Sequence, residues 1–291
     1  MGRGSTTRAK LTKMEDEYRD PHRTRYRACP ICGSTRIVVV RDQDWSWRPD
    51  YTAPLSRVIR WMGCASCAHE FAWGYHDKAG REIVFASAQA SQTAEGMTGT
   101  VAEEARLLWA DVVDAVSRYQ PDGHWLDIGA GSGMLLATAE EYGYTTAAIE
   151  ARPQVAHALI ALGIDVIGGD VSDLGAVGID EESVDVVTMC DVLEHLPFPL
   201  SGLAFAAQVL RPGGILFLSC PNRASFAWKR LSEEGINPYF SEIEHYHNFS
   251  YPQIRTLLGD HGFEPLACSV SGRYRLCMDV VARRVVDPGN L

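Results

Sequence analysis

The stretch Trp125-Leu-Asp-Ile-Gly-Ala-Gly-Ser-Gly133 decides the fold class of this chain. Its apolar run ends in three glycines at alternate positions, and a helical pattern follows over residues 132–142. A glycine-rich turn between a strand and a helix lets a ligand approach the backbone and the helix N-terminus. Met134 stands where the third glycine of the dinucleotide fingerprint belongs, and no Lys-Ser/Thr pair follows for a phosphate-binding Walker loop. The loop therefore indicates a ligand of another kind.

Two acidic residues near this loop narrow the choice of ligand. Asp127 lies two residues before Gly129, and Glu150 ends the next predicted strand, 21 residues after Gly129. An acid at the end of that strand accepts hydrogen bonds from a ribose diol, whereas the acid at 127 disfavours phosphate and suits an amine. S-adenosylmethionine (SAM) carries an ammonium, a carboxylate and a ribose but no phosphate. We therefore expect SAM, with the loop amides serving its carboxylate and Asp127 its ammonium. The expected binding residues are Asp127, Gly129, Ala130, Gly131, Gly133 and Glu150.

The rest of the second half alternates strand and helix patterns, which predicts a parallel sheet with helices on both faces. The tail differs, because Ser250 and Gln253 form a predicted capping box at the start of a last helix. Two further strands then surround a Ser-Gly turn, as in an antiparallel hairpin. The predicted strands cover residues 124–128, 145–149, 164–167, 183–190, 214–219, 263–270 and 275–281.

With these residues in place, the sequence resembles the class I SAM-dependent methyltransferases over about residues 101–285. Gly169-Asp170-Val171, the segment 185–196 and the segment 210–222 resemble later motifs of that family, in the same order. The resemblance implies an α/β, Rossmann-like fold with seven mostly parallel strands and an antiparallel last hairpin. It also implies that Asp170 and Val171 lie near the adenine, and that Cys190 and Asp191 lie beside the cofactor.

Four of the eight cysteines form two pairs, Cys29-Pro-Ile-Cys32 and Cys64-Ala-Ser-Cys67. In a chain expected in the cytoplasm, paired C-x-x-C motifs favour a metal over disulfides. Each pair places two thiolates on one tight turn, and two such turns complete a tetrahedral zinc site. We therefore expect a small N-terminal zinc-ribbon module that holds a structural Zn²⁺ through Cys29, Cys32, Cys64 and Cys67. A redox pair and unliganded thiols are the alternatives.

Charge divides the chain near residue 77. Residues 1–76 carry 13 Lys+Arg against 8 Asp+Glu, whereas residues 77–291 carry 14 against 29. We expect a basic tail (1–27), the zinc ribbon (28–76), a connector or lid with a helix (77–121) and a SAM-binding domain (122–291). Between the cysteine pairs, an insertion over residues 42–57 holds Trp45, Trp47 and Tyr51. These rings either cover the other domain, line the substrate entrance or pack against the ribbon.

Methyl transfer is an SN2 displacement at the sulfonium, so the protein must align the acceptor and remove its proton when that acceptor is a hydroxyl or a protonated amine. The segment 241–250 resembles the part of one methyltransferase subgroup that folds over the acceptor. We expect His245 or His247 to be the general base, oriented by Glu244, with His195 as the next candidate.

A catalytic metal is a further alternative. Asp191-x-x-Glu194-His195 resembles the E-x-x-E-H metal site of ubiquinone-pathway O-methyltransferases, with Asp in place of the first Glu. The sequence leaves open whether a divalent cation binds there.

Three functions fit these patterns. The first is a small-molecule methyltransferase, with O-methylation favoured and a natural product or sugar as the acceptor class that the subgroup resemblance implies. The second is an rRNA or tRNA methyltransferase whose basic ribbon grips RNA by charge and stacking. The acidic body and the lack of an N-P-P-Y type motif disfavour this nucleic-acid partner. The third is a non-catalytic SAM-binding scaffold.

Location and assembly follow from what the sequence lacks. No apolar stretch approaches the roughly 20 residues of a membrane span. Residues 1–10 lack the apolar core of a secretory signal. We therefore expect a cytoplasmic protein without a membrane partner, and the sequence leaves a homodimer open.

Overall fold

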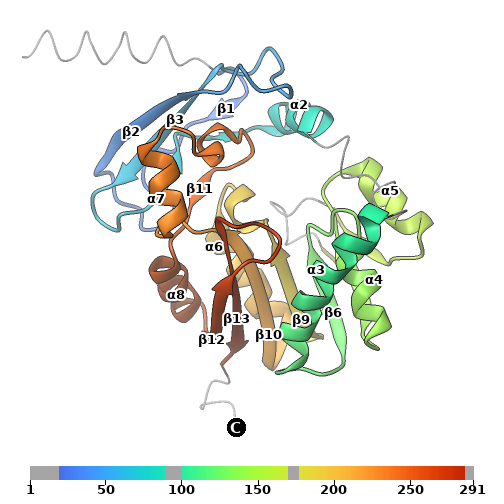
Figure 1. Cartoon of the computed structure of the whole chain (residues 1–291). Helices are drawn as coiled ribbons and strands as arrows, with labels where there is room; N and C mark the ends of the chain where they lie inside the picture. Colours follow the sequence, from blue (N-terminus) through green and yellow to red (C-terminus); the bar gives the residue numbers. More distant parts are fainter. Residues whose placement is uncertain (1–19, 89–99, 170–176, 286–291) are drawn as a thin grey trace, which may run out of the picture.

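The computed structural model describes residues 20–88, 100–169 and 177–285. Its largest sheet has seven strands in the order β12-β13-β10-β9-β6-β7-β8 (Figure 1). Strand β13 runs antiparallel to both β10 and β12, and the other neighbours pair in parallel. The predicted Rossmann-like sheet with an antiparallel last hairpin is therefore confirmed. The strands are β6 (His124–Ile128), β7 (Thr145–Ile149), β8 (Val166–Gly168), β9 (Val184–Cys190), β10 (Leu210–Pro221), β12 (Phe263–Val270) and β13 (Cys277–Arg284).

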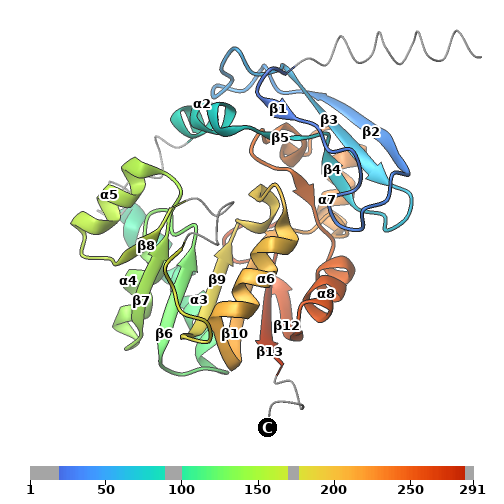
Figure 2. The same cartoon turned by 180° about the vertical axis from the view of Figure 1, so that it is seen from behind.

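Helices cover both faces of this sheet, as Figures 1 and 2 show from opposite sides. Alternate residues of β6 point to opposite faces, so that Trp125 joins the apolar cluster of one face and Leu126 that of the other. No helix in the described segments is long and apolar enough to cross a membrane. One face carries α3 (Thr100–Ser117), α4 (Met134–Glu141) and α5 (Pro153–Ala161), and the other carries α6 (Pro199–Val209) and α8 (Tyr251–Asp260).

A second sheet lies over the end of the main sheet where its parallel strands terminate (Figure 2). Its strand order is β11-β4-β3-β2, with β2 (Ile37–Asp44), β3 (Val58–Cys64), β4 (Glu70–Ala72) and β11 (His247–Asn248). Strands β2 and β3 pair antiparallel on either side of the aromatic insertion. Strand β11 comes from the C-terminal half of the chain, so this sheet joins distant parts of the sequence. A separate two-stranded sheet pairs β1 (Arg23–Thr24) with β5 (Tyr75–His76), and α2 (Lys78–Ala88) follows.

The aromatic insertion covers elements of the C-terminal half. Trp45 is fully buried in an apolar cluster that also contains Trp61 of β3, Trp228 of α7 (Phe226–Glu233) and Phe240 of η4 (Pro238–Ser241). The indole Nε1 of Trp61 donates a hydrogen bond to the Phe240 carbonyl at 3.1 Å. Trp47, by contrast, is 66% exposed. One ring of the insertion thus anchors it, and another faces solvent.

The predicted capping box at the start of α8 is wrong. Ser250 makes no side-chain hydrogen bond to the helix N-terminus. The side chain of Gln253 instead lies 3.2 Å from Nδ1 of His69, just before β4. A contact with the N-terminal sheet has taken the place of the local cap.

Candidate active site

The glycine loop joins β6 to α4 through three residues in the left-handed region of the backbone. The φ angles are 77° at Gly129, 57° at Gly131 and 75° at Gly133, where a residue without Cβ is favoured. The amides of all three glycines donate hydrogen bonds within the protein. The SAM carboxylate would therefore have to compete for these three of the loop amides that the sequence pattern assigned to it. Their acceptors are Ile149 O (2.7 Å), Glu150 Oε2 (3.0 Å) and Ala130 O (2.9 Å).

Asp127, in β6, is only 3% exposed. Its Oδ1 accepts a hydrogen bond from Oγ1 of Thr188 at 2.6 Å, and Trp125 Nε1 donates to the same Oγ1 at 3.0 Å. Burial raises the pKa of Asp127 to about 7. A cationic group beside the carboxyl would lower that pKa again, because an opposite charge favours the ionised form. The position therefore suits an ammonium group.

Glu150 follows β7 and lies beside the loop, as expected, but its oxygens are already occupied. Oε1 accepts from the backbone N–H and Nε of Arg152, at 2.9 and 2.7 Å. Oε2 accepts from Arg152 Nη2 and from the Gly131 amide, both at 3.0 Å. A carboxylate offers about four acceptor positions. A ribose diol would have to displace part of this Arg152 contact to bind Glu150.

The remaining expected cofactor contacts divide into two pairs. Asp170 and Val171 lie outside the described residues. Cys190 ends β9, and Asp191 follows in the left-handed region with a φ of 57°. The carboxylate of Asp191 accepts a hydrogen bond from Nη1 of Arg273 at 2.8 Å, an ion pair that the sequence did not indicate.

Two candidate histidines, His195 and His245, are in contact with each other. The rings of His195, at the end of η3 (Leu193–His195), and of His245 lie edge to face, with centroids 4.6 Å apart. His195 Nδ1 lies 3.1 Å from the Glu244 carbonyl oxygen. Because a carbonyl only accepts, Nδ1 carries the hydrogen and Nε2 of the neutral ring has a free lone pair. Burial lowers the pKa of His195 to about 4, so the ring is neutral at pH 7.

Buried polar atoms without partners surround these rings. Glu194 Oε2, Glu244 Oε1 and His245 Nδ1 make no hydrogen bond to any described residue. Burial raises the pKa of Glu194 well above its ordinary value and that of Glu244 to about 7. Val192, three residues before His195, packs against the glycine loop, because a Cβ at Gly129 would lie only 2.6 Å from its Cγ2. Buried polar groups in native proteins are nearly always paired, so these atoms mark a place for a ligand.

His247 lies away from this cluster. It is fully buried, with Nε2 2.9 Å from the Leu196 carbonyl and Nδ1 3.0 Å from Nε2 of His69. Both ring nitrogens are therefore engaged in joining β11 to the N-terminal sheet. The structure brings Glu244 and His245 to His195 and keeps His247 apart from them.

Residues 101–267, more than half of the chain, match the family model of a methyltransferase domain. The chain belongs to this methyltransferase family. It is 34% identical over 141 residues to a ubiquinone biosynthesis O-methyltransferase of Xanthomonas campestris pv. campestris, covering 45% of this chain and 58% of that protein. The protein of the same name from Xanthomonas axonopodis pv. citri is 34% identical over 146 residues, with 47% and 60% covered. The matched region thus spans less than two thirds of these curated relatives.

Solved structures resemble this methyltransferase in fold. A 1,6-didemethyltoxoflavin-N1-methyltransferase of Burkholderia thailandensis, with S-adenosylhomocysteine bound, has a TM-score of 0.51 at 17% identity, covering 76% of this chain and 98% of that one. An O-methyltransferase family 2 protein of Planctomyces limnophilus also gives 0.51 at 17% identity, with 71% and 69% covered. At these identities the likeness shows the fold alone.

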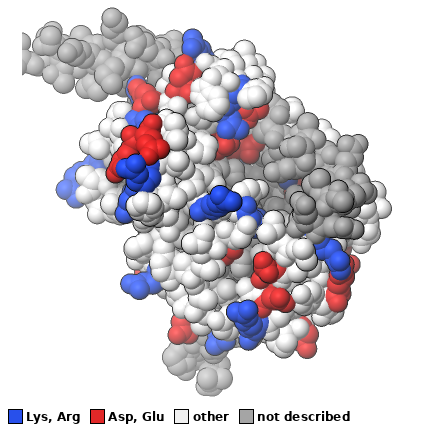
Figure 3. All heavy atoms as spheres, viewed as in Figure 1, with Lys and Arg blue, Asp and Glu red and all other residues white. Residues whose placement is uncertain are grey.

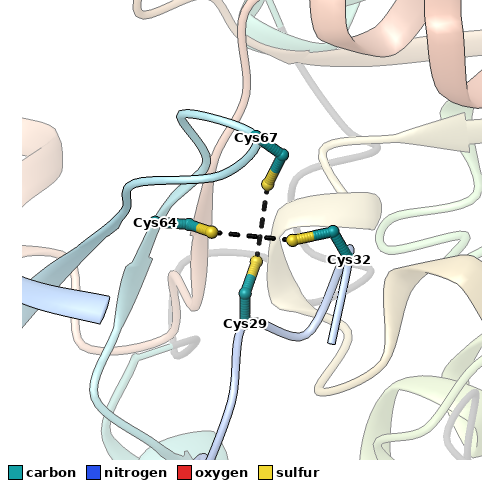
Figure 4. Close-up of side chains that lie close together, drawn as sticks. All are labelled: Cys29, Cys32, Cys64 and Cys67. Carbon is teal, nitrogen blue, oxygen red and sulfur yellow. Dashed lines mark hydrogen bonds between the residues drawn. The ribbon is translucent and has the colours of Figure 1, made fainter. Parts of the chain in front are cut away.

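The four paired cysteines of the methyltransferase converge on one point (Figure 4). Cys29 and Cys67 Sγ lie 3.6 Å apart, as do Cys32 and Cys64 Sγ, and all four sulfur atoms lie within 4.8 Å of one another. Four thiolates about 2.3 Å from a zinc ion at the corners of a tetrahedron would be spaced by about 3.8 Å. The arrangement therefore fits a Zn²⁺ ion, and none of the four forms a disulfide.

Several residues of this site escaped sequence reasoning. Thr188 lies in a buried apolar strand, where it looks like any β-branched residue. Arg152 follows Glu150 by two positions, and a bidentate pair at that spacing has no sequence signature. Arg273 lies in what reads as an ordinary hairpin turn. Their partners become visible only when the strands are assembled.

Proposed function

We propose that this methyltransferase uses SAM to methylate a hydroxyl group of a small molecule, with His195 as the general base. The observation that carries the proposal is the neutral His195 ring, held by Nδ1 on the Glu244 carbonyl, in the segment whose Val192 packs against Gly129 of the glycine loop. The Xanthomonas relatives are named as O-methyltransferases, which supports an oxygen acceptor. A natural product or a sugar is the acceptor class that we propose for this chain.

The proton of the acceptor hydroxyl passes to Nε2 of His195 in this proposal. The carboxyl group of Glu244 lies near the ring, with Oε2 3.9 Å from Nδ1 of His195. Its ionised form would stabilise the imidazolium that forms, because an opposite charge favours the charged ring. Neighbouring His245 is kept neutral by burial, so it adds no repulsive charge. His247, which uses both of its nitrogens elsewhere, takes no part.

Cofactor binding uses the residues around the loop. SAM supplies the electrophilic methyl group when it is bound. Asp127 would hold its ammonium, and the ribose would exchange with Arg152 on Glu150. The left-handed Gly131 would allow backbone approach, since even a Cβ at that position would meet its nearest heavy atoms only at 3.9 Å.

A divalent cation is a second candidate for activating the hydroxyl. One ligand atom each of Glu194, His195 and His245 lies within 4.8 Å of the others. Carboxylate and imidazole ligands suit several divalent metals. Asp191 is tied to Arg273, so His245 stands in the third position that the sequence motif assigned to Asp191. Loss of turnover in a chelator, with the cysteine site still loaded, would favour this route.

The charge distribution supports a small acceptor over RNA. Arginines of the N-terminal module are paired with carboxylates: Arg57 with Asp44 and Arg60 with Asp42. On the face in Figure 3, the blue and red side chains are interspersed and form no basic stripe. Steeply salt-dependent binding to bulk RNA would instead support the RNA alternative.

One measurement tests the proposal broadly. A native mass spectrum of the purified protein should show one zinc per chain, retained SAM or S-adenosylhomocysteine, and the number of subunits. Transfer of label from methyl-labelled SAM to a panel of hydroxylated small molecules then identifies the acceptor. A protein that binds SAM but labels no acceptor under any condition would support the scaffold alternative.

A further inference from the structure

Arg273 reaches over the end of the main sheet from the loop between β12 and β13. In Figure 1 this dark red loop leans toward α3. The guanidinium carbon lies 4.4 Å from the ring centroid of Trp109 in α3, and Nη1 donates to Asp191. The side chain is only 8% exposed. Two contacts thus fix the plane and one corner of a buried cation.

The other edge of this guanidinium consists of Nε and Nη2. Nε and Nη2 are buried and have no hydrogen-bond partner among the described residues. Arg48, Arg60 and Arg152 each use the same two nitrogens to hold both oxygens of a carboxylate. That planar fork matches carboxylate geometry. The Nε–Nη2 edge of Arg273 therefore fits a carboxylate, and no residue in the described part of the chain provides one.

Charge limits what this carboxylate can belong to. The fork lies among acids, since Nη1 contacts Asp191. Burial raises the pKa of Asp127 and of Asp191, and the charge of Arg273 acts in the opposite direction on both. A ligand with a lone negative charge would be repelled by those carboxylates, whereas an amino-acid zwitterion brings an ammonium for them. The glycine amides of the loop, the other candidate receptors, already donate within the protein.

We propose that Arg273 anchors the cofactor, binding the α-carboxylate of SAM with its Nε–Nη2 edge while Asp127 holds the neighbouring ammonium. This inference rests on the proposed use of SAM. It assigns the carboxylate to a residue of the hairpin turn in place of the loop amides.

Decarboxylated SAM, which keeps the ammonium and lacks the carboxylate, is the probe that tests the anchor. By calorimetry, the wild-type protein should bind SAM roughly 10- to 100-fold more tightly than decarboxylated SAM, as expected for a charged hydrogen-bonded pair. Arg273→Gln should weaken SAM by that factor and leave decarboxylated SAM within twofold. Arg275→Gln, at an exposed position two residues away, is the matched control and should change neither.

Each other outcome overturns a stated claim. Equal wild-type affinity for the two compounds, or an equal loss of both in Arg273→Gln, contradicts the anchor. Unchanged SAM affinity with a raised KM for the acceptor would assign Arg273 to the acceptor instead. If Arg273→Gln does not fold, Arg273→Lys replaces it, because lysine keeps the charge without the planar fork. This variant must still reduce the ratio of the affinities for SAM and decarboxylated SAM. A wild-type protein that binds neither compound would refute the proposed function itself.

Discussion

His195 and His247 both belong to segments that the sequence predicts near the acceptor, yet their rings make different contacts. His247 engages both nitrogens, with Leu196 and His69, whereas His195 engages only Nδ1. The sequence ranks His245 and His247 ahead of His195 as the general base, whereas our proposal, which starts from the ring contacts, puts His195 first. The ranking depends on which carbonyl each ring meets after folding, and spacing carries no such information.

Replacing His195 by alanine should lower kcat by roughly 10²- to 10⁴-fold, the usual cost of losing a general base. SAM affinity should stay within twofold. Because the pKa of His195 is about 4, wild-type kcat should fall only as the pH drops toward 4. His157→Ala, at an exposed position, is the control. A kcat that rises through pH 7 would instead identify Glu244, whose pKa is about 7, as the base.

We expect the Asp127 carboxyl to release a proton when the cofactor binds. Its pKa of about 7 leaves it mostly protonated at pH 6 in the free protein. An ammonium beside it lowers that pKa, so S-adenosylhomocysteine should release close to one proton per site at pH 6 and none near pH 9. Calorimetry in buffers of different ionisation enthalpy measures the number. Asp127→Asn should abolish the release, and an undiminished release in that variant would exclude Asp127 as its source.

The same carboxyl makes the protein without cofactor less stable as the pH rises toward about 7. Its raised pKa stabilises the fold at low pH, and this contribution is lost as the pH rises through about 7, because ionisation must then occur in a buried place. The Asn variant should lack that part of the pH dependence of thermal unfolding.

Among the elements, the aromatic insertion offers an internal comparison. Trp45 is fully buried against the C-terminal half, whereas Trp47 is 66% exposed. Trp45→Ala should lower the free energy of unfolding by roughly 3–5 kcal/mol, as for other large-to-small core changes. Trp47→Ala should change it by less than about 0.5 kcal/mol. Urea unfolding measures both, and similar losses for the two variants would contradict this docking of the insertion.

Regular elements were predictable where the pattern was long and local. β6 (His124–Ile128), β7 (Thr145–Ile149) and β12 (Phe263–Val270) have the predicted bounds. β11 could not be predicted, because two residues carry no period and their strand character comes from pairing with β4. The failed capping box has a similar cause, since Gln253 reaches a histidine that lies 184 positions earlier.

At the scale of the whole molecule, strand pairing connects the cysteine cluster to the segment that carries Glu244 and His245. The second cysteine pair leads directly into β4, and β4 pairs with β11, which follows Glu244 and His245. The zinc ion expected at the cysteines would stabilise the N-terminal sheet, although the ion itself lies outside the proposed catalytic residues. A closed site of four thiolates leaves no position for a substrate, so its effect on turnover would be indirect.

Removal of zinc should therefore loosen the acceptor side without releasing SAM. The Cys64→Ser, Cys67→Ser double variant should lose its metal, because ligation and local folding are coupled. Amide hydrogen exchange should rise over residues 244–248, while SAM affinity stays within about threefold. Elemental analysis and exchange mass spectrometry provide the two measurements. Full zinc occupancy in the double variant would refute the cysteine assignment, and unchanged exchange would refute the mechanical link.

The pairing of Glu70 with Asn248 has a consequence for how the protein is made. During synthesis, the outer edge of β4 has no partner until 178 further residues have been translated. The N-terminal sheet is therefore completed only by a segment that is synthesised much later than β4. An attempt to graft the first 76 residues onto another enzyme would carry an open strand edge, the kind of surface that recruits other chains into aggregates. A graft that also includes residues 242–250 would supply β11, the strand that pairs with this edge.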